Sequence, residues 1–437
     1  MNIYYCTFGC KVNQYETENL RQKLTALGYT ATENAESADI FIINTCTVTA
    51  QSDRKLRQTL HKLKKAAPSA VTVLTGCFAQ AFAKNAEQLD GCDIITGTAK
   101  GDIPALLEQF LRERKRLVRV VQHEKNESFE PMKNLPSGSK TRAHVKIQDG
   151  CDQYCSYCVI PYARGHIRSK PLDDIASEIT ALAQGGYKEV VLTGINLCCY
   201  GKDFGGGTRL VDAVETACAV EGIQRVRLSS MEPEMILDED IARLVRLENL
   251  CPQFHLSLQS GCDKTLRRMN RKYTCEQYKA LCGKLRKAFK DCVITTDIMV
   301  GFAGETDEDF ARTVDFVKDI GFEKVHIFPY SVRKGTAAER FDGQVEKAVK
   351  ERRAKELEKV CSQIRQEFLL SNVGRTVSVL FEKEKGDGWH RGYTMNYTPV
   401  KVRAQSGESW RWQSRNVLIQ GIDGDSCTAV LVPDGQL

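Results

Sequence analysis

The stretch Ala143-His-Val-Lys-Ile-Gln148, followed two residues later by Cys151-Asp-Gln-Tyr-Cys155-Ser-Tyr-Cys158, opens a repeating pattern of short β-rich runs and helices. Five more β-rich runs follow, at residues 189–193, 225–229, 254–258, 293–300 and 324–328. The first intervening helix is predicted to start at Pro171, because apolar side chains recur on one face after it: Leu172, Ile175, Ile179 and Leu182. Six such units in succession predict an incomplete parallel (β/α)6 barrel, with the cysteine triplet at the C-terminal end of its first strand.

The composition is that of a globular protein. Of 437 residues, 42% are apolar and 27% are charged, which fits two or three domains. No run approaches about 18 consecutive apolar residues, and the N-terminus lacks a signal-peptide pattern, so we expect a cytoplasmic protein with no membrane partner. We therefore interpret the 18 cysteines as reduced thiols rather than a disulfide framework, with some binding metal and the rest buried.

The first 122 residues also alternate strands and helices. Compact apolar runs at 3–7, 39–43 and 71–74 are typical of buried parallel strands. A helix is predicted between the first two runs, capped by Asn13 with Glu16 three residues on and stopped by Gly28. The order strand, helix, strand, helix predicts an N-terminal doubly wound α/β domain over residues 1–122.

Three further segments complete the predicted organisation. Residues 123–142 are polar and contain Pro131 and Pro136, so they are predicted to be a linker. The barrel with a trailing charged helix near residues 345–370 occupies 143–370. Residues 371–437 carry short β-rich runs at 377–381, 400–402, 416–419 and 427–432, which predict a small all-β barrel. Its three tryptophans lie among basic residues, which fits either an RNA-binding surface or a tryptophan-anchored core: Trp389, Trp410 and Trp412.

The triplet Cys151, Cys155 and Cys158 has the spacing C-x3-C-x2-C. Three thiolates this close can ligate three irons of a 4Fe–4S cluster and leave the fourth iron without a protein ligand. A zinc site remains the alternative, because His144 or His166 could supply a fourth ligand. The position at a C-terminal strand end of a barrel favours the cluster.

Small and polar residues follow the next strands of the barrel. Because the C-terminal ends of barrel strands share one mouth, we expect these residues to bind a cofactor beside the triplet. The candidates, together with Tyr157 inside the triplet, are Gly194, Asn196, Ser230, Glu232, Gln259 and Asp297.

A second group of cysteines follows the strands of the N-terminal domain. Cys10, Cys46 and Cys77 come after its first, second and third strands, so a parallel sheet places all three at its C-terminal edge, where such sheets bind ligands. Cys92 precedes a strand and is expected at the opposite edge. The three thiols could hold one metal centre, or they could be three unrelated buried cysteines.

The triplet with Tyr157 before its last cysteine resembles the signature of the radical S-adenosylmethionine (SAM) superfamily. That resemblance implies that the open iron binds the amino and carboxylate groups of SAM. An electron from the cluster then cleaves SAM to a 5′-deoxyadenosyl radical, while the protein positions the cofactor and excludes water.

The chain as a whole resembles the methylthiotransferases. Thr7-Phe-Gly-Cys10-Lys-Val-Asn-Gln-Tyr-Glu16, Asn44-Thr-Cys46 and Thr75-Gly-Cys77 are similar to their N-terminal domain. Residues 150–165, 229–233, 255–261, 270–271 and 296–306 are similar to their central domain. The β-rich C-terminal segment resembles, less specifically, their RNA-binding TRAM domain.

Within that family, the Cys10–Glu16 motif most resembles enzymes acting on threonylcarbamoyladenosine beside the tRNA anticodon. Relatives acting on isopentenyladenosine or on a ribosomal-protein aspartate are the alternatives, and a non-enzymatic RNA-binding protein with structural metal sites is a further one. Two departures concern the substrate side of the site: Cys262, where a serine is common, and Ser331-Val-Arg-Lys334, which lacks a familiar proline pattern.

The resemblance implies two 4Fe–4S clusters, a radical cluster on Cys151, Cys155 and Cys158 and an auxiliary one on the other three cysteines. One SAM would methylate a sulfur on the auxiliary cluster, and a second would give the radical that takes hydrogen from carbon 2 of adenine. The carbon radical would then accept the methylthio group. The implied partners are a tRNA anticodon stem-loop, an electron donor such as flavodoxin or ferredoxin, and a sulfur source.

Basic residues near the cysteine loops are candidates for RNA contacts. The net charge is only +6, but Arg164, Arg168 and a run from Arg112 to Arg119 concentrate positive charge. We expect them to engage tRNA phosphates or the threonyl carboxylate. Ordinary salt bridges are the alternative for each arginine.

Overall fold

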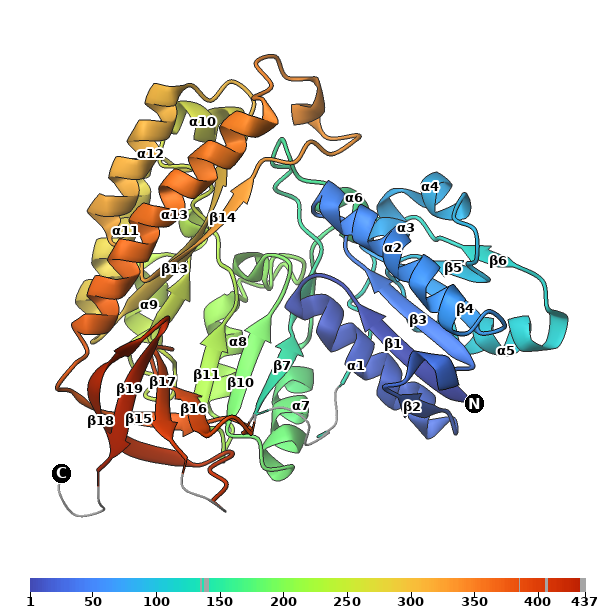
Figure 1. Cartoon of the computed structure of the whole chain (residues 1–437), viewed down its shortest axis with the longest axis horizontal. Coiled ribbons are helices and arrows are strands. Elements are labelled where there is room, and N and C mark those ends of the chain that lie inside the picture. Colours follow the sequence, from blue (N-terminus) through green and yellow to red (C-terminus); the bar gives the residue numbers. More distant parts are fainter. Residues whose placement is uncertain (134–135, 137–140, 385, 405–407, 433–437) are drawn as a thin grey trace.

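The computed structural model describes residues 1–133, 136, 141–384, 386–404 and 408–432. Figure 1 shows three groups of elements, an N-terminal sheet, a central set of strands and helices, and a small C-terminal barrel beneath the central strands. In the described ranges no helix combines the length and apolarity needed to cross a bilayer. The expected linker segment includes 134–135 and 137–140, which lie outside the described residues.

The N-terminal group is a parallel six-stranded sheet, as predicted, with the order β2-β1-β3-β4-β5-β6. Its strands are Asn2–Thr7, Thr30–Thr32, Ile40–Thr45, Val71–Gly76, Ile94–Thr96 and Leu117–Arg119 for β1 to β6. Helices α1 (Lys11–Ala26) and α5 (Ile103–Glu113) cover one face, whereas α2 (Ala50–Ala66), α3 (Cys77–Ala81) and α4 (Ala83–Glu87) cover the other. The strand order changes direction between β1 and β3, because β2 lies on one side of β1 and the later strands lie on the other. Open α/β sheets bind ligands at such a point.

The central group is the predicted incomplete barrel of six parallel strands. They are β7 (Arg142–Lys146), β10 (Glu189–Thr193), β11 (Arg225–Leu228), β12 (Gln253–His255), β13 (Val293–Val300) and β14 (Lys324–Pro329). Helices α7 (Leu172–Gln184), α8 (Leu210–Cys218), α9 (Asp238–Leu244), α11 (Cys275–Ala288) and α12 (Asp307–Ile320) pack outside, where they share the largest core with the strands. In the described ranges the strands pair as two three-stranded sheets, β11-β10-β7 and β12-β13-β14; isolated bridges connect the chain around β11 and β12, whereas no pairing joins β7 to β14, so the barrel stays open there.

The C-terminal group is a closed five-stranded barrel. Helix α13 (Lys347–Leu370) leads into it from the central group, as Figure 1 shows. Its strands are β15 (Thr376–Phe381), β16 (Trp389–Tyr393), β17 (Pro399–Arg403), β18 (Ser414–Asp423) and β19 (Ser426–Leu431). Strand β16 was not predicted, because its inward residues are His390 and Gly392 rather than apolar side chains.

The predicted cap of α1 is wrong. The helix begins at Lys11 with Cys10 as its N-cap residue, so Asn13 lies inside the first turn. The amide of Asn13 donates instead to the carbonyl oxygens of Phe8 and Thr45, at 2.8 and 2.9 Å. Gly28 does follow the end of the helix, with φ of 89°.

Candidate active site

Cys10, Cys46 and Cys77 lie together at the C-terminal edge of the N-terminal sheet. They follow β1, β3 and β4, which are neighbours in that sheet. Burial raises the pKa of the Cys46 thiol to about 11, and the nearby thiols of Cys77 and Cys10 add to the rise. We call these three cysteines the separated set, because three different loops supply them.

Two glycines let these loops approach each other. Gly9 has φ of +95°, and a β-carbon there would lie 2.6 Å from Cβ and 2.8 Å from Sγ of Cys46. Gly76 has φ of +100°, and a β-carbon there would lie 2.6 Å from the backbone nitrogen of Thr45. Residues with a side chain rarely adopt these φ values, and a β-carbon would not fit at either position. The residue before Cys10 and the residue before Cys77 must therefore be glycine.

Cys151, Cys155 and Cys158 lie in one loop between β8 (Gln148–Asp149) and α6 (Ile160–Arg164). Burial raises the pKa of Cys151 to about 11, and the Cys155 thiol adds to the rise. The backbone N–H of Ile160 lies 3.4 Å from Sγ of Cys158 and donates to it. We call these three cysteines the contiguous set.

The spacing of both sets argues against a single zinc ion. One tetrahedral zinc ion holds its sulfur ligands about 3.8 Å apart. In the part of the chain that the structure describes, only His255, Asp297 and His326 form a group of three such ligand atoms within 4.8 Å of one another. The more widely spaced thiols of each set fit a cluster of several irons. His166, one of the two expected alternative zinc ligands, instead contacts Asp152 at 2.7 Å.

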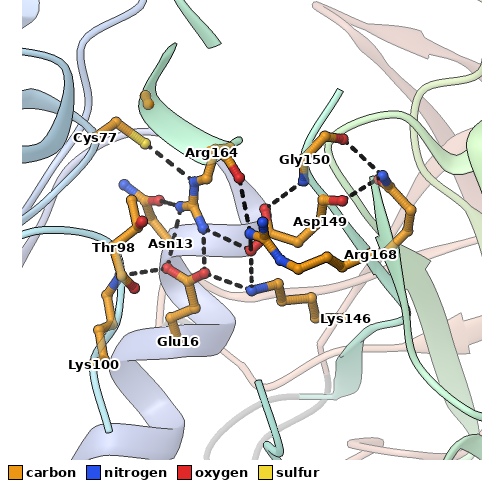
Figure 2. Close-up of polar contacts among 12 residues, drawn as sticks. Asn13, Glu16, Cys77, Thr98, Lys100, Lys146, Asp149, Gly150, Arg164 and Arg168 are labelled. Carbon is orange, nitrogen blue, oxygen red and sulfur yellow. Dashed lines mark hydrogen bonds and ion pairs between the residues drawn. The ribbon is translucent and has the colours of Figure 1, made fainter. Parts of the chain in front are cut away.

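A buried arginine joins the two sets (Figure 2). Arg164 ends α6, directly after the contiguous set, and its Nε donates to Sγ of Cys77 at 3.3 Å. Its Nη2 donates to Oδ1 of Asn13 at 2.6 Å, and its Nη1 pairs with Glu16. Because Arg164 is fully buried, it cannot contact RNA phosphates or a threonyl carboxylate, and that expectation is wrong.

Arg164 belongs to a larger buried network that spans the two groups of elements (Figure 2). Glu16 accepts from Lys100 at 2.7 Å and from Lys146 at 2.8 Å. Burial alone would raise the pKa of Glu16, but Arg164 and the two lysines hold it well below its usual range. Asp149 accepts from Lys146 at 2.6 Å and lies 3.3 Å from Arg164. These interactions fix the N-terminal sheet against the first strand of the barrel.

The network carries more positive than negative side chains. Its basic members are Lys100, Lys146, Arg164 and Arg168, and its carboxylates are Glu16, Glu127 and Asp149. Arg164, which pairs with Glu16 and lies near Asp149, also donates to Cys77. A buried positive charge stabilises a thiolate, which is the form of cysteine that ligates iron, so this environment fits a metal cluster at the separated set.

Arg168 is also part of this network. It pairs with Glu127 at 3.0 Å, and its exposed fraction is 6%. Glu127 belongs to the expected linker, so this segment is packed against the barrel where the structure describes it. The predicted RNA contact of Arg168 is therefore wrong, and the salt-bridge alternative holds.

The basic run of α5 and β6 does not lie at one edge of the sheet. Arg116 donates to the backbone oxygens of Glu87 and Leu89, which precede β5 and so mark the N-terminal edge of the sheet. The cysteines occupy the C-terminal edge, so the expectation of positive charge near a cysteine loop is wrong for Arg116. Arg119 ends β6 at the C-terminal edge, where it pairs with Asp102 at 3.5 Å.

The contiguous set has its own buried arginine, which sequence reasoning missed. Nη1 of Arg271 donates to Sγ of Cys155 at 3.2 Å, and Nη2 pairs with Glu232. Burial raises the pKa of Glu232, and Glu234 and Asp297 add to the rise while Arg271 opposes it. Residues 270–271 resemble the family pattern, but this resemblance gave Arg271 no role, because its loop between α10 (Asp263–Arg268) and α11 is distant in sequence from the cysteines.

The other predicted cofactor residues surround this loop. Tyr157 is close to Cys155 and packs edge-on against Phe302. Asn196 is buried, and its side-chain oxygen has no hydrogen-bond partner in the described ranges, as a polar ligand would require.

Four other candidates line the same strand ends. Gly194 packs against Gln148, and Ser230 is exposed beside Glu232. Gln259 has φ of +70°, and its backbone N–H donates to Asp297 at 2.8 Å. The carboxylate of Asp297 instead faces His255, at 3.1 Å.

The two positions that depart from the family pattern both have structural roles. Cys262 is buried, with Sγ 3.4 Å from Asp309. Arg333 reaches from the loop after β14 to Thr47, just after Cys46, at 2.7 Å. Arg333 also pairs with Asp53 at 2.8 Å, so it is a second link from the barrel to the separated set.

The three tryptophans have three different environments. Trp410 is buried in the barrel core and stacks on His390 with ring centroids 3.9 Å apart. Trp412 packs against Tyr187 of the central group. Trp389 lies partly exposed between two cations, with Arg403 at 4.1 Å and Lys401 at 4.8 Å from its ring.

Two family models match separate parts of the chain. The Radical SAM superfamily model matches residues 145–317, which include the contiguous set. The model of Uncharacterized protein family UPF0004 matches residues 2–97, which include the separated set.

Curated relatives match nearly the whole chain. The "Threonylcarbamoyladenosine tRNA methylthiotransferase MtaB" of Bacillus subtilis is 36% identical over 91% of this chain and 89% of its own length. The protein of the same name from Thermotoga maritima is 37% identical over 98% and 96%. A "tRNA-2-methylthio-N(6)-dimethylallyladenosine synthase" of Thermoanaerobacter sp. is 36% identical over 87% and 82%.

Among solved structures, the radical S-adenosylmethionine methyltransferase TsrM of Kitasatospora setae has a similar fold. The TM-score is 0.56 over 75% of this chain and 72% of that one, at 15% identity.

Proposed function

The chain belongs to the radical SAM methylthiotransferase family, and from that premise we propose that it transfers a methylthio group to carbon 2 of threonylcarbamoyladenosine beside the tRNA anticodon. Enzymes of the superfamily use SAM and a 4Fe–4S cluster. The further elements of the proposal are a second cluster, the tRNA substrate and the residue roles.

The observation that carries the proposal is the contact of Arg164 with Cys77 (Figure 2). Helices α3 and α6, which begin at Cys77 and end at Arg164, pack directly on each other. The two cysteine sets are thus held on facing sides of one interface. An enzyme that makes a radical at one centre and takes sulfur from another needs this closeness.

The residues divide into ligands and supporting groups. Cys151, Cys155 and Cys158 would hold the radical cluster, and Cys10, Cys46 and Cys77 the auxiliary one. With SAM, these clusters would supply the radical that removes hydrogen from carbon 2, the methyl group and the transferred sulfur. Arg271 and Arg164 each donate to one cysteine sulfur and neutralise charge there.

The polar groups around the contiguous set would bind SAM. Asn196 and Glu232 would hold its amino and hydroxyl groups, and Tyr157 packs against Phe302 beside the loop. Gly194, Ser230, Gln259 and Asp297 would complete the pocket rim. Burial around these groups excludes water from the site of radical formation.

The proposed substrate rests on the relatives. Relatives named for threonylcarbamoyladenosine rank above those named for dimethylallyladenosine in overall similarity, although one of the latter covers 94% of the chain. Besides tRNA, the reaction requires an electron donor such as flavodoxin or ferredoxin and a sulfur source.

Mass spectrometry of tRNA nucleosides tests this function. Cells that lack this protein and its relatives should contain threonylcarbamoyladenosine without the 2-methylthio group, and adding back the chain should restore the group. Restoration of 2-methylthio-dimethylallyladenosine instead would show that the substrate is wrong. Restoration of neither by a protein with full iron content would contradict the methylthiotransferase activity.

The roles of the two cysteine sets can be distinguished in the same assay. Cys10→Ala should abolish methylthiolation but keep reductive cleavage of SAM, because the contiguous set stays intact. Cys155→Ala should abolish both. Equal loss of SAM cleavage in the two variants would contradict the assignment of separate roles.

A further inference from the structure

Charged side chains line the inner face of the open barrel. Along β7, β10 and β11 the residues with inward side chains include Arg142, Glu189 and Arg227, while the residues between them pack outward on the helices. Glu189 lies 3.1 Å from Arg142 and 3.6 Å from Arg227. Glu189 is therefore shared by both guanidinium groups, and Arg142 has a second carboxylate partner in Glu382 at 2.5 Å.

The guanidinium group of Arg227 lacks one of its hydrogen-bond acceptors. Its exposed fraction is 5%, and its guanidinium stacks on the ring of Tyr397 at 3.4 Å and donates to Gln253. Its Nη1 is buried and has no hydrogen-bond partner in the described part of the chain. A buried donor without an acceptor is costly, and it leaves a positive potential on this wall.

Lys11 adds a third positive charge to the same place. It is the first residue of α1, directly after Cys10, and Figure 1 shows that α1 begins beside the strands of the barrel. Its side chain is exposed and makes no hydrogen bond or ion pair in the described ranges. Partial desolvation by the surrounding protein and the charges of Arg227 and Arg142 together lower the pKa of Lys11 to about 8, whereas the nearby carboxylate of Glu189 opposes this decrease.

The open side of the barrel gives a ligand access to this ammonium group. On strand β14, which borders the opening, the side chains of Lys324, His326 and Phe328 are all exposed. Lys11 and Lys324 also lower the pKa of His326, although burial has the larger effect. The carboxylate on this side, Asp297, already faces His255. Glu189, the carboxylate that faces Lys11, is shared between Arg142 and Arg227, so the ammonium group of Lys11 has no ion pair of its own in the described ranges.

We propose that Lys11 binds the carboxylate of the threonyl group on the substrate nucleoside. This inference rests on the proposed function, because it assigns a residue to one part of that substrate. The carboxylate supplies the anion that Lys11 lacks, and the guanidinium groups of Arg142 and Arg227 strengthen its binding. The dimethylallyl group has no charge and gains nothing from Lys11. Because Lys11 follows Cys10 directly, it anchors the modified base beside the separated set.

Binding to three anticodon stem-loops of one sequence tests the inference, with the full chain carrying its clusters. Adenosine next to the anticodon is threonylcarbamoylated, dimethylallylated or unmodified. The wild-type chain should bind the first roughly 10-fold more tightly than the others, which is the range for a hydrogen bond to a charged group. Lys11→Met should remove this preference without weakening the other two complexes.

Two further variants serve as controls. Lys11→Arg keeps the charge and should keep most of the preference. Lys23→Met removes the same charge from the last turn of the same helix, away from the barrel, and should change none of the three affinities. Lys11→Met should fold normally, because Lys11 makes no hydrogen bond or ion pair to lose; iron content and thermal unfolding check this.

Three outcomes would overturn the inference. Equal weakening of all three complexes by Lys11→Met would show a phosphate contact. An unchanged preference in Lys11→Met would exclude Lys11 as the anchor. A wild-type chain that methylthiolates threonylcarbamoyladenosine but binds all three stem-loops equally would exclude carboxylate recognition. Failure of the proposed function is distinct, because the wild-type chain would then form no 2-methylthio-threonylcarbamoyladenosine in tRNA.

Discussion

The two cysteine sets reach similar surroundings by opposite routes. The contiguous set lies within eight residues of one loop, whereas the separated set is gathered from three strand ends between Cys10 and Cys77. Yet in each set one cysteine sulfur accepts a hydrogen bond from a buried guanidinium group. The donor is Arg271 at 3.2 Å in the contiguous set and Arg164 at 3.3 Å in the separated set. The first arginine comes from the same barrel as its cysteines. The second comes from the other half of the molecule.

This difference indicates what each set depends on. The contiguous set needs only its loop and the barrel beneath it. The separated set needs the N-terminal sheet, the glycine contacts between its loops and the docked barrel that supplies Arg164 and Arg333. We therefore expect the separated set to be the more easily lost when the two halves are loosened.

Removing Arg164 should have the largest effect. Arg164→Met leaves Glu16 and Asp149 with less compensation, and breaking a buried ion pair costs about 3–5 kcal/mol. We expect a lower midpoint of thermal unfolding and loss of iron from the separated set before the contiguous one. Arg112→Met, at an exposed ion pair, should change stability by less than about 1 kcal/mol. Equal unfolding midpoints for both variants would contradict the role of the network.

A smaller change should affect the separated set alone. Gly9→Ala places a methyl group against Cys46, so iron content should fall from about eight to about four atoms per chain while SAM cleavage persists. Gly28→Ala is the matched control, because φ there is +89° but nothing lies within 4 Å. It should cost about 1 kcal/mol of stability and no iron. Loss of SAM cleavage in Gly9→Ala would mean that the two sets are not independent.

The corresponding test of the contiguous set uses Arg271→Lys. Lysine keeps the charge but cannot donate to Cys155 and Glu232 together, so the sulfur loses a hydrogen bond. We expect a decrease in the reduction potential of the radical cluster on the order of tens of millivolts, measured by spectroelectrochemistry. Arg268 pairs with Asp342 near the surface, so Arg268→Lys should leave the reduction potential unchanged. A shift in the auxiliary cluster instead would reverse our assignment.

The smallest effect is expected outside both sets. Trp389→Ala removes the partly exposed ring between Lys401 and Arg403 and should weaken tRNA binding roughly 5-fold, with iron content intact. Filter binding or fluorescence anisotropy would measure this. Trp412→Phe, at the contact with Tyr187, is the control and should bind tRNA normally. An unchanged affinity in Trp389→Ala would restrict RNA binding to the other two groups of elements.

The sequence was most informative where the position of a residue follows from the direction of its strand. Parallel strands end at one edge, so the convergence of Cys10, Cys46 and Cys77 could be predicted without knowing any contact. Glu16 was misassigned as a capping residue because its partners, Lys100 and Lys146, are distant in sequence.

Arginine roles were the least predictable. Arg164 and Arg168 were expected to bind RNA because they are basic and follow a cluster loop, but their carboxylate partners come from other elements. Burial and long-range pairing, which decide whether a guanidinium faces solvent or protein, leave no local pattern in the sequence.

The link between Arg164 and Cys77 also has a consequence for biosynthesis. The two residues are 87 positions apart, and a ribosome adds roughly 5–20 residues per second, so Arg164 is made roughly 4–17 s after Cys77. During that delay the nascent N-terminal sheet exposes three thiols without their cation. Stable binding of iron at the separated set is thus expected to follow translation of the barrel, which supplies Arg164.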